Sequence, residues 1–199
     1  MFTNSRKFDF PPELQFSDGT LLELRSEKKL LGVIISNDLK WRKNTTFIVS
    51  KARQKLWILQ RALPLNFSVT ELFDIYTKEV RSILEYAVPV WHSGLSRKEV
   101  TEIEAVQKFA FRIILRKQYS SYSDACNFFG TQTLDERRQM ICLRFVAKNL
   151  TSENSLFTLS IQNERLRPRK QKVQEFKCNT SRFQRSSLPY LSQLANSQL

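Results

Sequence analysis

The chain has 199 residues, enough for one domain with a substantial core, and its formal net charge at pH 7 is +13. Its three cysteines form no C-x-x-C pair and are odd in number, which argues against a disulfide scaffold or a zinc knuckle and favours a reducing compartment. The N-terminal residues contain no apolar signal region and the longest apolar run is too short to span a bilayer, so we expect a soluble, intracellular protein of the nucleus or cytoplasm with no membrane contact.

The positive charge is unevenly distributed along the chain. The surplus of Lys and Arg falls in residues 41–70, 96–120 and 161–199, whereas residues 71–95 carry more acids than bases. Clustering of this kind is typical of a protein that binds a polyanion. We favour nucleic acid over a surface that is basic only for solubility, because a general surplus would be spread evenly.

A small β element is expected within residues 1–40. Two short apolar segments, 14–16 and 21–24, flank Asp18-Gly19, which is a common turn in β-hairpins. Residues 30–36 form a β-branched run typical of a strand that is buried on both faces. Because three short strands are too few to form a domain, we expect an N-terminal neighbour that completes the sheet.

A strongly basic helix is predicted over residues 43–63, closed by Pro64. No acidic residue occurs between Asp38 and Glu71. Trp57 lies off the apolar stripe and beside cations, which suits stacking on a base or a sugar. The alternative is that this indole packs against a neighbouring helix or domain. The apolar stripe consists of Ile48, Ala52, Leu56, Leu59 and Leu63.

The least basic stretch, residues 71–87, is predicted to be the buried central helix of the protein. Ser68 and Glu71 have the spacing of a capping box, and Pro89 places the helix end near residue 87. Residues 88–94 are expected to form a compact turn with large apolar side chains to bury. The apolar face comprises Leu72, Tyr76, Val80, Ile83, Leu84 and Ala87.

Further capping signals predict three more helices after residue 95. They start at Ser96, Ser121 and Thr133, and the last helix extends to about Leu150. The sequence therefore predicts a helical bundle over residues 41–150.

Beyond residue 151 the periodicity fails and cations dominate. We expect residues 151–199 to form a basic, largely disordered tail that can fold onto a polyanion, with one docked turn or short helix at 187–194. The predicted fold is thus mainly α: a small N-terminal β element, a helical bundle and this tail. The cations of the tail include Arg165, Arg167, Arg169, Lys170, Lys172, Lys177, Arg182 and Arg185.

Catalytic chemistry is not visible in the sequence. Polymerases hold two metal ions with paired aspartates, and no adjacent Asp pair occurs here. The single histidine, His92, has no Cys or carboxylate at ligand spacing, which favours a structural role. Cys142 lies on an apolar face without a partner base. We expect no enzyme activity, no metal site and no cofactor.

Four separate blocks resemble the C-terminal third of the reverse transcriptase of non-LTR (LINE-type) retrotransposons, in the order in which that family has them. The blocks are Lys29–Trp41, Lys51–Leu56 with Tyr76–Leu95, Glu104–Ile114 with the residues that follow up to Arg138, and Thr180–Leu191. The resemblance implies that residues 1–40 are the end of a polymerase core and that the helical region is thumb-like. In that family this region grips template RNA and the primer duplex.

The sequence departs from the complete family pattern because it lacks the fingers, the catalytic palm and any endonuclease. It therefore looks like a truncated open reading frame or a degraded copy. The expected partner is nucleic acid, namely RNA, an RNA–DNA hybrid or DNA. The candidate nucleic-acid-binding residues are Lys43, Lys51, Arg53, Lys55, Trp57, Arg112, Arg116, Lys117, Arg167, Arg169 and Lys170.

A second hypothesis comes from a different functional class. In this view the chain is a protein-interaction module, or an inert helical remnant, that docks a reverse transcriptase core while its cations are merely solvated. It predicts exposed apolar surface on residues 29–41.

Overall fold

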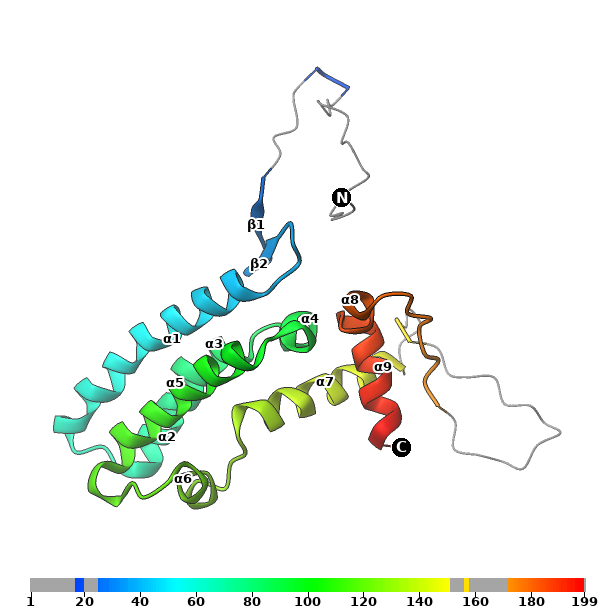
Figure 1. Cartoon of the computed structure of the whole chain (residues 1–199). Coiled ribbons are helices and arrows are strands. Elements are labelled where there is room, and N and C mark those ends of the chain that lie inside the picture. The colour runs from blue at the N-terminus through cyan, green and yellow to red at the C-terminus, as the bar shows by residue number, and fades with distance from the viewer. Residues whose placement is uncertain (1–16, 20–24, 151–155, 158–171, 199) are drawn as a thin grey trace, which may run out of the picture.

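The computed structural model describes residues 17–19, 25–150, 156–157 and 172–198 (Figure 1). The architecture is mainly helical, with a two-stranded antiparallel hairpin preceding a bundle of helices. The predicted fold class is confirmed. Among the described residues, no helix is long and apolar enough to cross a membrane.

The hairpin consists of β1 (Glu27–Leu30) and β2 (Val33–Ser36), with Leu30 opposite Val33. The prediction of one continuous strand over residues 30–36 was wrong, because Leu31 and Gly32 both adopt positive φ and form a two-residue turn. Burial on both faces was also wrong: β1 is exposed throughout, and β2 is buried at its two ends. The predicted strands at 14–16 and 21–24 lie outside the described residues.

Helix α1 (Arg42–Ala62) packs in parallel against α5 (Arg97–Leu115). Arg42 at the start of α1 pairs with Glu102 near the start of α5. At the other end, the carbonyl of Leu63 accepts a hydrogen bond from Arg116, just beyond α5. Four residues of the predicted apolar stripe are buried, namely Ile48, Ala52, Leu56 and Leu59. Leu63 is only partly buried and lies, with Pro64, in the 3₁₀ turn (Leu63–Leu65) that follows the helix.

The central segment contains α2 (Val69–Tyr76), a π-helical turn (Thr77–Arg81) and α3 (Ser82–Glu85). The capping box is confirmed: Ser68 Oγ accepts from the Glu71 N–H, and the Glu71 carboxylate accepts from the Ser68 N–H at 2.8 Å. Ala87, at φ 52°, turns the chain into α4 (Val88–Trp91), so the expected compact turn is a short helix with Pro89 in its first turn.

Two further helices follow α5 in the bundle, α6 (Tyr122–Phe128) and α7 (Leu134–Leu150). Beyond residue 172 the chain forms α8 (Ser181–Gln184) and α9 (Ser187–Gln198). Helix α9 crosses α7 and also contacts α4, with Leu191 fully buried (Figure 1). Of the two alternatives predicted for residues 187–194, the helix is confirmed, and it is longer than expected. The expectation of a largely disordered tail covered all of residues 151–199. Residues 151–155 and 158–171 lie outside the described residues, whereas α8 and α9 form within the part that is described, and α8 was not expected.

Candidate nucleic-acid interface

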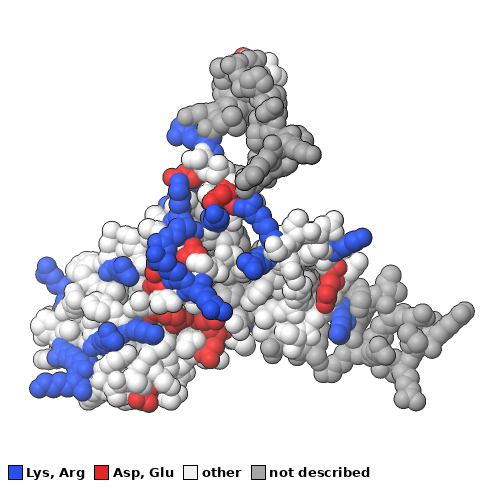
Figure 2. Space-filling view, viewed as in Figure 1, with Lys and Arg blue, Asp and Glu red and all other residues white. Residues whose placement is uncertain are grey.

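Helix α1 presents cations on its outer surface because its apolar stripe faces α5 and the central segment. The helix has no acidic residue in its first turn and ends with Arg61 in its last turn. Figure 2 shows Lys and Arg gathering at the lower left, where α1 ends, and across the middle of this face, where acidic residues lie beside them. Which of these cations remain uncompensated depends on the neighbouring elements.

Two of the predicted binding lysines form ion pairs within the fold. Lys43 pairs with Glu27 of β1. Lys55 Nζ lies 2.9 Å from Oε2 of Glu79, in the π-helical turn. An opposite charge at this distance reduces the field that either lysine presents to a phosphate.

Lys51 and Arg53, the other two predicted cations of α1, lie on opposite sides of the helix, because two positions correspond to a rotation of about 200° around its axis. Lys51 lines a hollow with Gly32, Ile83 and Tyr86, on the side of the central segment. Arg53 lines a different hollow with Glu102, on the α5 side. The structure therefore does not bring Lys51 and Arg53 together into one patch.

Trp57 lies on the outer surface of α1 and is 56% exposed. The guanidinium of Arg61, one helical turn further on, lies 5.9 Å from the centroid of the Trp57 ring. A large exposed aromatic ring with an adjacent cation is the arrangement that stacks on nucleic-acid bases. Arg61 was missed at the sequence level, although its i+4 spacing from Trp57 was a signal.

The remaining candidates lie where α5 ends. Arg116 donates from Nη2 to the Leu63 carbonyl at 3.3 Å, which ties the ends of α5 and α1 together. Arg112 lies over the ring of Tyr119, with 5.3 Å between its guanidinium carbon and the ring centroid. Arg116 and Lys117 line an open hollow of about 500 Å³ together with the exposed side chain of Phe67.

These contacts define one candidate site, the basic end, which comprises Trp57, Arg61, Arg116 and Lys117. Within the part of the chain that the structure describes, none of its three cations is in an ion pair with a carboxylate. Cations also suit this position because α1 and α5 both end here, where the helix dipoles are negative. The predicted contacts Arg167, Arg169 and Lys170 fall outside the described residues.

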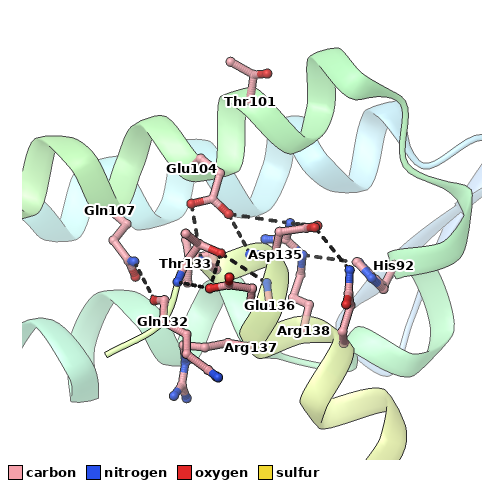
Figure 3. A network of polar contacts seen from close by, with 12 residues as sticks. His92, Thr101, Glu104, Gln107, Gln132, Thr133, Asp135, Glu136, Arg137 and Arg138 are labelled. Atoms are coloured by element: carbon pink, nitrogen blue, oxygen red, sulfur yellow. Dashed lines mark hydrogen bonds and ion pairs between the residues drawn. The ribbon is translucent and has the colours of Figure 1, made fainter. Parts of the chain in front are cut away.

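A buried polar network joins the middle of α5 to the start of α7 (Figure 3). The Glu104 carboxylate accepts from the backbone N–H of Asp135 at 2.7 Å and of Leu134 at 3.3 Å, which caps the start of α7. Tyr122 Oη donates to the same carboxylate at 2.5 Å. Gln107 Nε2 donates to Tyr122 Oη at 2.8 Å, and Gln107 Oε1 accepts from Tyr76 Oη at 2.6 Å.

The predicted structural role of His92 agrees with its place in this network. Its Nδ1 accepts a hydrogen bond from Nε of the fully buried Arg138 at 3.3 Å. Burial, and then the charge of Arg138, lower the pKa of His92 to about 4. Arg138 also pairs with Asp135 at 2.9 Å. Cys142 is buried, and burial raises the pKa of its thiol to about 12, so it has little thiolate character.

Among the described residues, no group of three or more His, Cys, Asp or Glu side chains is arranged to hold a metal ion. Comparison with protein-family models, with curated proteins and with solved structures found no match to this chain.

Proposed function

We propose that this chain binds nucleic acid through the basic end, as the C-terminal, thumb-like part of a non-LTR reverse transcriptase that lacks the catalytic palm. RNA, an RNA–DNA hybrid or DNA would be the ligand, binding rather than catalysis the activity, and the nucleus or cytoplasm the location. The observation that carries the proposal is the exposed Trp57 beside Arg61, near the end of α1 to which Arg116 is bonded and where Lys117 also lies. In the described structure none of these three cations is in an ion pair with a carboxylate.

The chemistry of the basic end suits contact with a nucleic-acid backbone. Arg and Lys contact phosphates with little sequence information, so affinity would come from charge and fall steeply with salt. Three phosphate contacts give a slope of roughly −3 in log K against log salt on a duplex. Trp57 adds stacking or sugar contact of about 1–3 kcal/mol.

The test removes charge from the basic end without touching the packed core. In the double variant Arg61→Gln/Lys117→Gln, we expect affinity for an RNA–DNA hybrid to fall about tenfold or more at low salt, and the salt slope to flatten by about 2. Fluorescence anisotropy over a salt series measures both quantities. Circular dichroism checks that the variant is folded.

A matched control is the double variant Arg144→Gln/Lys177→Gln, which removes the same charge from exposed positions on α7 and ahead of α8. It should keep most of the affinity and nearly the full slope. If the basic-end variant is folded and binds like the control, the basic end is not the interface.

A second candidate function, docking to a polymerase core, is favoured by the exposed hairpin. Leu30 is 57% and Leu31 84% exposed, and the half-exposed Tyr86 donates a hydrogen bond to the Leu31 carbonyl at 2.9 Å. Exposed apolar side chains on an edge strand are typical of surfaces that pair with another chain. Sedimentation without nucleic acid separates the two functions: self-association together with no salt-dependent binding would favour docking.

A further inference from the structure

Three segments that are far apart in the sequence line a second basic surface at the opposite end of α1. They are residues 39–42 at the start of α1, residues 93–99 at the start of α5, and residues 181–187 around α8. Two hollows of about 570 and 490 Å³ share Lys40, Trp41, Gly94 and Arg185 in their linings, so they adjoin. We call this surface the junction groove.

Specific hydrogen bonds fix the α8 wall of the junction groove. Ser187 Oγ donates to the Pro89 carbonyl at 2.6 Å, which joins the start of α9 to α4. Arg182 donates to the backbone carbonyl of Asp38, which joins α8 to the segment before α1. Figure 1 shows α8 next to α4. The groove is therefore formed by the docked C-terminal helices, and not by one helix face.

The groove carries more positive charge than its carboxylates compensate. One carboxylate lines the groove, that of the buried Glu99, and its Oε2 accepts hydrogen bonds from the N–H and the hydroxyl of Ser96. Beside the groove, Asp38 lies 3.8 Å from Lys40, and Glu102 pairs with Arg42 at 3.0 Å. In the described ranges, neither Lys98 nor Arg185 is in an ion pair, and Arg182 contacts a backbone carbonyl rather than a carboxylate.

An aromatic ring lies among these cations. The indole of Trp41 packs so closely on Gly94 that a Cβ at residue 94 would lie 2.4 Å from Trp41 Cδ1, so only glycine fits there. Trp41 is half-buried and lines both hollows. It also precedes α1, whose first turn has no side-chain cap and no acidic residue, so the helix dipole there is not offset by a carboxylate on the helix itself.

We propose that the junction groove binds the backbone of a single nucleic-acid strand that extends from a duplex held at the basic end. The inference rests on the proposed function for its ligand. A recess lined by cations and an aromatic ring is the arrangement that tracks a single strand, whereas a rigid duplex needs a surface it can lie across. Helix α1, with 21 residues, separates the two surfaces by about 30 Å, or about nine nucleotide steps.

The experiment uses the full chain and three ligands: a blunt RNA–DNA hybrid of about 12 base pairs, the same hybrid with a single-stranded extension of about six nucleotides, and the extension strand alone. The variant is Lys98→Gln/Arg185→Gln, and the control is Arg144→Gln/Lys177→Gln. Anisotropy gives the affinities.

We expect the extension to raise the affinity of the parent chain and of the control about tenfold, and the groove variant to lose this gain while binding the blunt hybrid normally. The inference is overturned, while the proposed function stands, if the extended hybrid binds no more tightly than the blunt hybrid. It is also overturned if the folded groove variant keeps the gain in affinity. If the blunt hybrid does not bind, the proposed function fails. In that case, binding of the extension strand alone tests the groove. If the parent chain binds this strand and the groove variant does not, the groove inference is upheld. If the parent chain does not bind the strand, or the variant binds it equally well, the groove inference is overturned.

Tryptophan fluorescence separates a nucleic-acid strand from an acidic protein segment as the occupant. In a Trp57→Phe background, the two remaining indoles are Trp41, which lines the groove, and Trp91, which is fully buried. Quenching by the extension strand therefore reports on Trp41. A hexaglutamate peptide that quenches to the same extent at the same concentration and salt would overturn the nucleic-acid assignment.

Discussion

Acidification should destabilise this fold through His92, the one histidine of the chain. The ring is only 8% exposed and lies against α7 and α9: Nδ1 accepts from Arg138, and the ring meets Tyr190 edge-on with 5.7 Å between the ring centroids. Burial is the main cause that lowers the pKa of His92 to about 4, the Arg138 charge adds to it, and Asp135 opposes it. Protonation would place an N–H against the guanidinium that now donates to that nitrogen.

The sign and size follow from the difference in pKa between the two states. The unfolded chain takes up a proton near pH 6.5 and the folded chain near pH 4, so between these values the unfolded state binds more protons. The free energy of unfolding therefore falls as the pH falls. The loss is about 2 kcal/mol by about pH 5 and about 3 kcal/mol once the pH is below both values.

Urea unfolding at about pH 7 and about pH 5 measures this loss, in a range where most carboxylates remain ionised. His92→Gln is the matched variant, because its side-chain oxygen can accept from Arg138 but does not titrate. The parent chain should lose about 2 kcal/mol over this range and the variant less than about 0.5 kcal/mol. Equal losses in both proteins would refute the argument, because the pH dependence would then come from other groups.

Two further changes test the basic end and the interior. Arg116 has φ 49° and ψ −117°, a conformation that favours glycine, so Arg116→Gly should raise the free energy of unfolding by about 1 kcal/mol while weakening nucleic-acid binding. Arg116→Ala should weaken binding without the gain in stability. Gln107→Leu leaves the buried Tyr76 hydroxyl without its acceptor and should cost about 2–4 kcal/mol in urea unfolding. Adding Tyr76→Phe should recover part of this loss, since no hydroxyl then remains unpaired.

The helix starts were predictable because a cap is a local interaction. Ser68 with Glu71 and Ser96 with Glu99 form complete capping boxes in the structure, and Ser121 Oγ accepts from the Asp124 N–H. Each pair lies three residues apart, so the sequence contains both partners. The burial of the α1 stripe followed in the same way from helical periodicity.

The errors arose where a non-local contact or an unusual backbone decides the structure. Leu31 adopts φ 44°, and leucine gives no turn signal, so the 30–36 run looked continuous. Tyr86 Oη binds the Leu31 carbonyl from 55 residues away and so supports the turn. The π-helical turn at Thr77–Arg81 likewise has no signature in its residue types, all of which are compatible with an α-helix.

The binding surface was only partly predictable because charge pairing is a property of the fold. By residue type alone, Lys55 and Arg61 are equivalent cations of one helix. In the structure Glu79 compensates Lys55, whereas Arg61 lies next to Trp57 and has no acid opposite it in the described bundle. The sequence thus gives the number of cations, and the ion pairs of the folded chain decide which of them keep an uncompensated charge for a polyanion. For this chain that selection leaves a cluster at each end of α1, which is why a ligand with both a duplex and a single strand is the informative probe.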